Sequence, residues 1–191
     1  PEGAKAGFAS LPPRPVIGTG SKRRELYVKE LCPQARVELI RGMWKRAFPS
    51  WKRASMTGLF LPSRFGPSGI MEKEKERFSF TPLEPSLFLP AACQGIIAVE
   101  GRSDWEYREA VAQLCHRESL LSFEAERRVL EVLQADCSQP AAAYSVTEKT
   151  EETERFRLTV MYGGRQVQGE GGVKERLALA DALSLQIRRE L

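Results

Sequence analysis

The stretch VIGTGSKRRELYVKEL, residues 16–31, joins a short apolar segment to a charged segment through a turn at Gly20-Ser21. The apolar segment predicts a strand at 15–19, and the charged segment predicts a helix at 20–31 with Ser21 near its start. A second apolar segment, RVELI at 36–40, predicts the next strand. Strands that alternate with helices along a chain are typical of an α/β domain built on a parallel sheet.

Further along the chain the order of elements changes. A basic helix is expected after Gly42 and before Pro49, and a long amphipathic helix is expected at 118–135. The other expected elements are strands at 57–61, 95–101, 141–147, 156–162 and 165–171 and helices at 104–115 and 174–190. The last three strands read as an antiparallel set. The chain is therefore expected to hold an α/β segment and then a small α+β segment, with a boundary near 116–120.

Composition and cysteine spacing exclude several classes of protein. The 191 residues are 42% apolar and 28% charged, which is ordinary for a globular protein. The four cysteines are scattered without a CxxC pair, so neither a metal site nor a disulfide framework is expected, and reduced thiols predict a cytoplasmic location. No apolar stretch approaches about 18 residues, so no membrane span is expected. The N-terminal PEGAKAG lacks a Met and reads as a chain entered in the middle.

Positive charge is concentrated near the N-terminus. The net charge is +4, and residues 14–53 hold eleven Lys and Arg against three Glu. No nucleic-acid motif and no interleaved aromatic residues accompany this basic segment, so no nucleic-acid partner is predicted. Small polycarboxylates or phosphates fit the segment equally well, because Arg pairs with carboxylates through two parallel hydrogen bonds.

Arginines follow the ends of two expected strands. Arg23 and Arg24 lie in the first turn of the helix after the first strand, and Arg41 follows the second strand. Helix N-termini and guanidinium groups both attract anions, so the three arginines would form an anion-binding wall at one edge of the sheet. A solvated basic face explains the same spacing equally well, and spacing alone does not decide between the two interpretations.

A cysteine lies between the long helix and an alanine-rich strand. In VLQADCSQPAAAYS, residues 132–145, Cys137 follows the expected helix end, and Pro140 prevents helical continuation. One interpretation is a small residue that fills a junction. The other is a nucleophile or a point of covalent attachment. The local sequence by itself favours the packing interpretation.

Five motifs occur in one order along the chain. They are VIGTGSKRR at 16–24, IRG at 40–42, LPAACQGIIAVEGR at 89–102, HRESLLSFEAER at 116–127 and LQADCSQP at 133–140. Together they resemble the hydroxymethylbilane synthase (porphobilinogen deaminase) family, whose patterns are approximately GTSSLRR, LRGN, LPAxGQGAxxIExR, HxxT followed by AER, and GGCxxPxG. The resemblance runs from about residue 15 to the C-terminus.

The resemblance implies a transferase of tetrapyrrole (haem) biosynthesis. The family joins four porphobilinogen units head to tail, with loss of ammonia at each step, on a dipyrromethane cofactor bound to a cysteine. Cys137 matches that cysteine, so the resemblance reverses the local interpretation. Arginine and hydroxyl side chains would bind the carboxylates of the pyrroles. The residues that the resemblance assigns to cofactor and substrate binding are Cys137, Arg23, Arg24, Arg41, Ser21, Thr19, Gln94 and Gly95.

The resemblance also implies a division of the chain. Residues 1–90 would form the family's second domain, an arginine-bearing, anion-binding α/β domain like those of periplasmic binding proteins. Residues 91–117 would supply a hinge strand, which contains Gln94 and Gly95, and a helix, both belonging to another domain of the family. Residues 118–191 would form a small α+β cofactor-attachment domain with a three-stranded antiparallel sheet.

The sequence departs from the family pattern at several positions. The family's catalytic Asp lies in an HSxKD-like stretch, and residues 1–191 contain none, so no catalytic residue is assigned. The second arginine of LRGNxxTR survives only as Arg46, one position away, or not at all; Cys93 replaces a glycine of GQG, and Asp136 replaces a glycine of GGC. One hypothesis is a fragment or degenerate copy of the enzyme, inactive by itself and completed by a separately encoded N-terminal domain. The alternative is a non-catalytic tetrapyrrole- or anion-binding relative.

Overall fold

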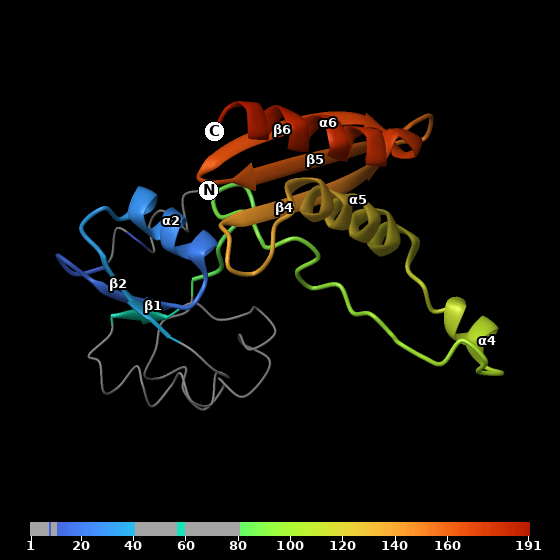
Figure 1. The fold of residues 1–191 in the computed structure, drawn as a ribbon, viewed down its shortest axis with the longest axis horizontal. Coiled ribbons are helices and arrows are strands. Elements are labelled where there is room, and N and C mark those ends of the chain that lie inside the picture. The colour runs from blue at the N-terminus through green and yellow to red at the C-terminus, as the bar shows by residue number, and fades with distance from the viewer. Residues whose placement is uncertain (1–7, 9–10, 41–56, 60–80) are drawn as a thin grey trace. The chain divides into compact units, whose positions relative to one another are not determined.

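The chain divides into two compact units, Pro1–Phe88 and Leu89–Leu191, and each unit has its own sheet. The structure is a computed structural model that describes residues 8, 11–40, 57–59 and 81–191 (Figure 1). The helix expected between Gly42 and Pro49, together with Arg41 and Arg46, lies outside the described residues.

Unit Pro1–Phe88 contains a parallel sheet in the order β2-β1-β3. Strand β1 is Val16–Thr19, helix α2 is Lys22–Leu31, strand β2 is Arg36–Leu39 and strand β3 is Gly58–Leu59. The α2 helix connects β1 to β2, as a crossover between parallel strands requires. The prediction of an α/β segment is confirmed to this extent, whereas a periplasmic-binding-protein-like domain is not confirmed.

Unit Leu89–Leu191 contains an antiparallel sheet in the order β4-β5-β6. Its strands are β4 (Ala141–Lys149), β5 (Glu154–Tyr162) and β6 (Arg165–Gly172). Its long helices are α5 (Arg117–Leu133) and α6 (Arg176–Arg189), and a short 3₁₀ turn, Val173–Glu175, precedes α6. The three-stranded antiparallel sheet near the C-terminus is the one that the sequence predicted.

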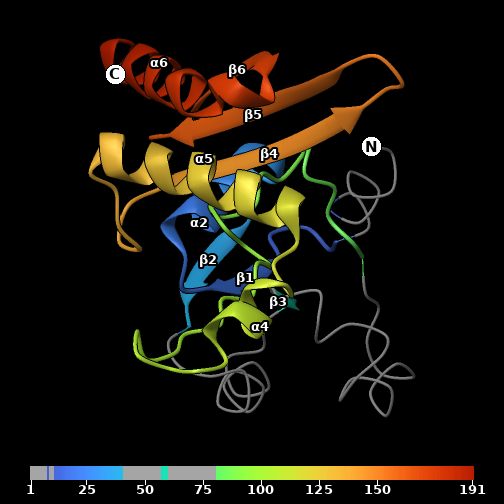
Figure 2. The same ribbon diagram turned by 90° about the vertical axis from the view of Figure 1, so that its right-hand side faces the viewer.

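The two helices cover one face of this sheet (Figure 2). Phe156, Leu158 and Val160 alternate along β5 with Arg155, Arg157 and Thr159, so one face of the strand is apolar and the other face begins with two charged residues. The apolar face packs against the buried sides of α5 and α6. The core residues of the unit are Leu121, Ala125, Val129, Leu133, Ala143, Phe156, Leu158, Val160, Val167, Val173, Ala180, Leu183 and Ile187.

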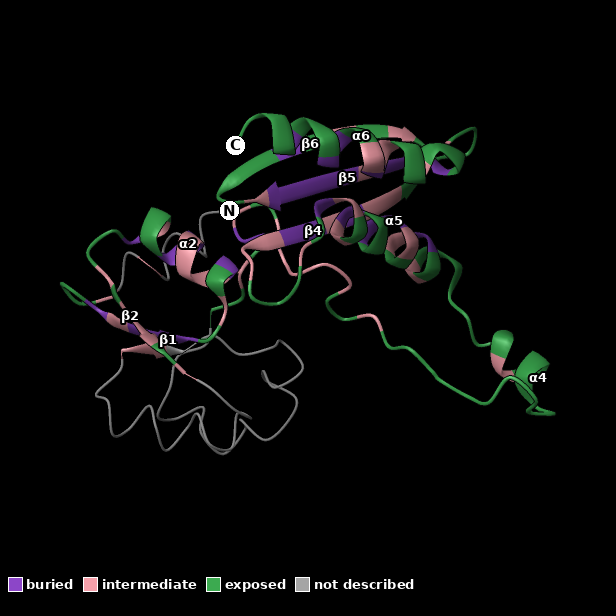
Figure 3. Cartoon of the chain, viewed as in Figure 1, coloured by how far each residue is buried: buried purple, intermediate pink, exposed green. Residues whose placement is uncertain are grey.

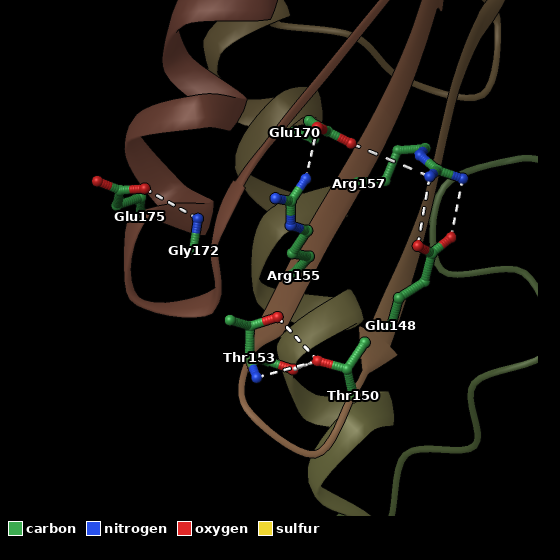
Figure 4. A network of polar contacts seen from close by, with 8 residues as sticks. All are labelled: Glu148, Thr150, Thr153, Arg155, Arg157, Glu170, Gly172 and Glu175. Atoms are coloured by element: carbon green, nitrogen blue, oxygen red, sulfur yellow. Dashed lines mark hydrogen bonds and ion pairs between the residues drawn. The ribbon is translucent and has the colours of Figure 1, made fainter.

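The opposite face of the sheet carries a network of paired charges (Figure 4). Arg157 Nη1 lies 2.9 Å from Glu148 Oε1, and Arg157 Nη2 lies 4.0 Å from Glu170 Oε2. Arg155 Nη1 donates a hydrogen bond to Glu170 Oε1 at 3.1 Å. These pairs are solvent-exposed, so each contributes little to stability. These charges leave the first half of β5 solvated on this face, whereas Thr159 and Met161 further along the same face are buried.

The β5–β6 hairpin closes through a two-residue loop, Gly163-Gly164. Both glycines have positive φ angles, 60° and 90°, and Tyr162 pairs with Arg165 across the loop. Two consecutive positive φ angles match the right-handed twist of the flanking strands and favour glycine. The turn therefore fixes the register that places Val160 beside Val167 in the core.

The expected strand at 95–101 does not form, and this prediction is wrong. Ile97 is 88% exposed and Val99 is 69% exposed, and no described strand pairs with this segment. Figure 3 shows the stretch of chain that leads to α4 coloured as exposed. A strand needs a neighbour to satisfy its backbone hydrogen bonds, and apolar composition alone cannot supply one. The helix expected at 104–115 is also shorter than predicted, since α4 spans only Arg108–Ala112.

No helix within the described ranges combines the length and the apolar composition that crossing a bilayer requires. The cytoplasmic location inferred from the cysteines stays a prediction.

The core of unit Leu89–Leu191 predicts a large effect of a single truncation. Leu158→Ala should lower the free energy of unfolding by about 2–5 kcal/mol, because Leu158 is fully buried between the sheet and both helices. Leu177→Ala, on the exposed side of α6, is the matched control and should cost much less. Urea titration of both variants measures the difference; equal midpoints would contradict the assigned core.

Candidate functional site

The turn between β1 and α2 is built by two hydroxyl groups. Thr19 Oγ1 accepts a hydrogen bond from the Ser21 backbone N–H at 3.2 Å, and Ser21 Oγ accepts one from the Arg24 N–H at 3.5 Å. Ser21 is the N-cap of α2, as the sequence predicted. Because each hydroxyl accepts from the backbone, its O–H hydrogen is left as a donor for a ligand.

Gly20 lets this turn approach the end of β2. A Cβ atom added at Gly20 would lie 2.4 Å from the carbonyl oxygen of Ile40, which is closer than real side chains approach. Ile40 also donates its N–H to the Thr19 carbonyl at 3.3 Å. The ends of two adjacent parallel strands therefore meet beside the first turn of α2, which is the usual place for ligands in α/β sheets. Arg41, the next residue, lies outside the described residues.

Two guanidinium groups lie in the first turn of α2. Arg23 is only 4% exposed, and its Cζ atom lies 5.6 Å from the centroid of the Phe88 ring. Burial, together with repulsion from Arg24, lowers the pKa of Arg23 to about 10, so the group stays charged at neutral pH. Arg24 is half-buried, and burial lowers its pKa as well.

The positive charges oppose the local field of the helix. The N-terminus of a helix carries a partial positive charge and attracts anions, so cations in the first turn are unfavourable there. Arg23 and Arg24 also repel each other, as the lowered pKa of Arg23 records. An anion bound at this turn would relieve both repulsions. The arrangement is therefore suited to binding carboxylates or phosphates.

In unit Leu89–Leu191, Cys137 lies in a tight turn after α5. Its thiol is unpaired with any other cysteine and exposed. The Asp136 carbonyl accepts a hydrogen bond from the Gln139 N–H at 3.2 Å, which makes Cys137 the first central residue of a β-turn. An exposed thiol on a tight turn is open to reaction, in contrast with the buried thiol of Cys32.

The side chain of Asp136 stiffens the same turn. Its Oδ1 atom accepts hydrogen bonds from the Ser138 N–H at 2.7 Å and from the Ser138 hydroxyl at 2.6 Å. The Ser138 hydroxyl and N–H hold the pKa of Asp136 below its usual range, so the carboxylate is ionised at neutral pH. A fixed negative charge therefore lies next to Cys137 along the chain.

Both ends of the turn are anchored in the core. Leu133 at the end of α5 and Ala142 at the start of β4 are buried. Two residues between them bond to the end of β5. The Tyr162 hydroxyl donates to Gln139 Oε1 at 3.3 Å, and the Gly163 N–H donates to the Pro140 carbonyl at 3.2 Å. The Cys137 thiol is thus held on a short loop with fixed ends, rather than on a free tail.

Gln94 and Gly95 lie in a turn, not in the strand that the sequence predicted. The Gln94 N–H donates to the Ala91 carbonyl at 3.0 Å, and Gln94 Oε1 accepts from the Ala91 N–H at 3.2 Å. Both residues are exposed, and Gly95 has a φ of 96°. Cys93, which stands where the family pattern has glycine, has a φ of 60° and so occupies a conformation that favours glycine.

A buried carboxylate holds this turn against the sheet. Glu126 on α5 accepts the Cys93 N–H at 2.6 Å on Oε2, and it accepts the N–H and the hydroxyl of Ser145 at 2.9 and 2.8 Å on Oε1. Burial raises the pKa of Glu126, and these donors oppose that effect. Burial and the Glu126 charge also raise the pKa of the Cys93 thiol to about 11, so Cys93 is a thiol at neutral pH.

Sequence reasoning did not assign a role to Glu126 or Phe88. Glu126 could have been found, because it lies in the AER motif three residues after Phe123 and three before Val129, on the apolar side of the helix. Nothing in the sequence around Phe88 relates it to Arg23, since the two residues are far apart along the chain.

The chain is similar to known porphobilinogen deaminases. Residues 3–110 match the family model described as "Porphobilinogen deaminase, dipyromethane cofactor binding domain". A porphobilinogen deaminase of Clostridium kluyveri is 36% identical over 152 residues, which are 78% of this chain and 49% of that protein. Those of Coxiella burnetii and Corynebacterium diphtheriae are 32% and 30% identical, over 83% and 93% of this chain and 50% and 60% of the relatives. The chain thus spans about half the length of these curated relatives.

The Glu126 contacts predict a specific loss of stability. Glu126→Leu would leave the buried N–H groups of Cys93 and Ser145 without an acceptor, at a cost of about 1–3 kcal/mol for each donor. Hydrogen exchange should also show loss of protection at the Cys93 amide.

Glu131→Leu is the matched control, because Glu131 lies on the exposed side of the same helix in weak pairs with Arg127 and Arg128. It should change stability by less than about 1 kcal/mol and leave the Cys93 amide protected. Equal effects of the two substitutions would show that Glu126 does not hold the turn.

Proposed function

The chain belongs to the porphobilinogen deaminase family, and on this premise we propose that it binds the carboxylates of pyrrole substrates at the β1–α2 turn and carries a dipyrromethane on Cys137. The matched family model confirms dipyrromethane as the cofactor that the motifs predicted. Cys137 lies outside the matched residues 3–110, so the point of attachment belongs to the proposal. The observation that carries it is the exposed thiol of Cys137 on its anchored turn.

The reaction that we propose is that of hydroxymethylbilane synthase, a transferase. Four porphobilinogen units would be condensed head to tail, and each condensation would release ammonia. When bound, the cofactor supplies the acceptor end to which the first pyrrole is added. The residues of this chain would bind and hold the pyrrole units, because a pyrrole with acetate and propionate side chains is an anion that suits paired guanidinium groups.

The described residues fit such a cofactor chemically. A thioether needs an accessible sulfur atom, and Cys137 is exposed. In the attachment step, the Cys137 sulfur would bond to the methylene carbon of porphobilinogen, the carbon–nitrogen bond would break, and the thiol proton would leave with the ammonia. This step needs neither oxidant nor reductant. The ionised Asp136 beside it would disfavour a neighbouring carboxylate, while its hydrogen bonds to Ser138 take up part of that charge.

At the β1–α2 turn, Arg24 would make the most direct contact with a carboxylate, because it is more exposed than Arg23. The buried Arg23 would add a fixed positive charge, and the hydroxyls of Thr19 and Ser21 would donate hydrogen bonds to the carboxylate. Arg41, Gln94 and Gly95 are also proposed to bind cofactor or substrate, on the basis of the motifs alone.

We also propose the division of the chain that the motifs imply. The boundary between Phe88 and Leu89 supports residues 1–90 as the family's second domain, periplasmic-binding-protein-like, as does the parallel order of its sheet. The exposed apolar residues Ile97 and Val99 support a separate role for 91–117 as a hinge. The remaining residues, 118–191, would be the cofactor-attachment domain.

Binding groups alone do not make a catalyst. Arginines that hold substrate and transition state equally lower no barrier, and the family's reaction needs a carboxylate near its cationic intermediates. Residues 1–191 contain no HSxKD-like stretch. We therefore propose that these 191 residues by themselves form no hydroxymethylbilane, and that the family's N-terminal domain would have to supply the carboxylate. The same observation favours the second candidate, a non-catalytic relative that binds tetrapyrroles or other anions.

The first prediction from this proposal concerns Cys137. Expression with a supply of porphobilinogen should add the mass of a dipyrromethane to the chain, and Cys137→Ser should abolish that mass because a hydroxyl is a far weaker nucleophile than a thiolate. Cys115→Ser is the matched control, since Cys115 is also exposed, and it should keep the adduct. Intact-mass and peptide spectrometry measure both. An adduct that survives Cys137→Ser would place the attachment elsewhere.

The second prediction concerns Arg24. Arg24→Leu should weaken porphobilinogen binding by about 1.5–3 kcal/mol, or roughly tenfold to a hundredfold in Kd, because it removes a charged hydrogen-bonding group. The Kd of Arg24→Lys should fall between those of the wild type and of Arg24→Leu, since Lys keeps the charge but lacks the paired donors of Arg. Lys22→Leu removes the same charge from an exposed neighbour that pairs with Glu25, and it should have a smaller effect in calorimetry. Unchanged binding in all three variants would favour a solvated basic face.

A further inference from the structure

Phe88 forms an aromatic surface against which Arg23 packs. It lies at the end of a single turn in which the N–H groups of Leu87 and Phe88 both donate to the Glu84 carbonyl, at 3.0 and 2.9 Å. Its side chain is only 7% exposed. The Arg23 Cζ atom lies 5.6 Å from the ring centroid, within the range of a cation–π interaction.

Tyr27 supports Phe88 from the same helix that carries Arg23. The two ring centroids lie 4.6 Å apart with an angle of 33° between the ring planes. Tyr27 is buried and comes one helical turn after Arg23, so both residues project from one side of α2. Residues 84–88 and α2 are thereby joined through a buried group of one cation and two rings.

This packing opposes the forces that would move Arg23. The guanidinium is desolvated and is repelled by Arg24, and both effects disfavour its charged form in the buried position. An aromatic face attracts a cation most strongly when water is excluded, as it is here. A guanidinium already held in place also loses less conformational entropy when an anion binds.

We propose that Phe88 is a positioning residue, which holds the Arg23 guanidinium beside Arg24 and so prepares the β1–α2 turn to bind the carboxylates of a pyrrole. Phe88 acts through Arg23 and does not itself contact the ligand. Tyr27 fixes the plane of the Phe88 ring. The inference rests on the proposed function, because that function supplies the ligand.

The test is a set of variants in the 191-residue chain, with porphobilinogen as the probe in calorimetry. Phe88→Leu keeps an apolar side chain but removes the aromatic face, and it should raise Kd about threefold to tenfold, the range of a cation–π interaction. Phe88→Tyr keeps the ring and should bind like the wild type. In the Arg23→Leu background, Phe88→Leu should have no further effect on Kd, because the two residues act as one unit.

A second measurement separates this inference from the proposed function. The Arg23 side-chain N–H resonance should be shifted by the Phe88 ring current in NMR spectra, and the shift should vanish in Phe88→Leu and persist in Phe88→Tyr. If the wild type binds no porphobilinogen, the proposed function is overturned, and the NMR spectra alone decide whether Phe88 holds Arg23. An unshifted Arg23 resonance, or Kd values that do not respond to Phe88→Leu, would overturn the inference.

Discussion

Burial of one face of a three-stranded sheet is the constraint on which unit Leu89–Leu191 depends. A sheet this small is marginal unless something covers its apolar face, and α5 and α6 provide that cover for Phe156, Leu158 and Val160. The packing fixes where α5 ends and where β4 begins. The short connection between them therefore has anchored ends, and Cys137 is presented on it as an exposed thiol. A reactive side chain on a short loop obtains its position from the core beneath.

Helix α5 also holds the turn around Cys93, which comes before it in the chain. Glu126 projects from α5 into a polar site where the N–H groups of Cys93 and Ser145 converge on its two oxygens. A buried carboxylate is tolerated only when such donors compensate for lost water. Beyond this turn, Ile97 and Val99 are exposed, so the chain leaves the packed core of the unit close to Gly95. The turn at Cys93 is thus the last anchored part of the motif that contains it.

The most informative feature of unit Pro1–Phe88 is electrostatic. Two cations at the N-terminus of α2 oppose both the helix dipole and each other. Such repulsion costs stability, a bound anion would offset it, and functional sites are where proteins retain costs of this kind. The Phe88 ring keeps the buried Arg23 in place despite that cost. Gly20 allows the turn to lie against the end of β2, so the charge gathers at the strand ends.

The sequence by itself determined most of the order of the described elements, the antiparallel set at the C-terminus and, through five motifs, the family. These depend on residues close together in the chain, such as Ser21 as N-cap or Gly163-Gly164 in a two-residue loop. Only the tertiary structure decided that 95–101 lacks a strand partner and that Arg23 is buried, because local periodicity does not reveal what a segment packs against. The Glu126–Cys93 and Arg23–Phe88 contacts join residues far apart in the sequence, so folding alone brings them together.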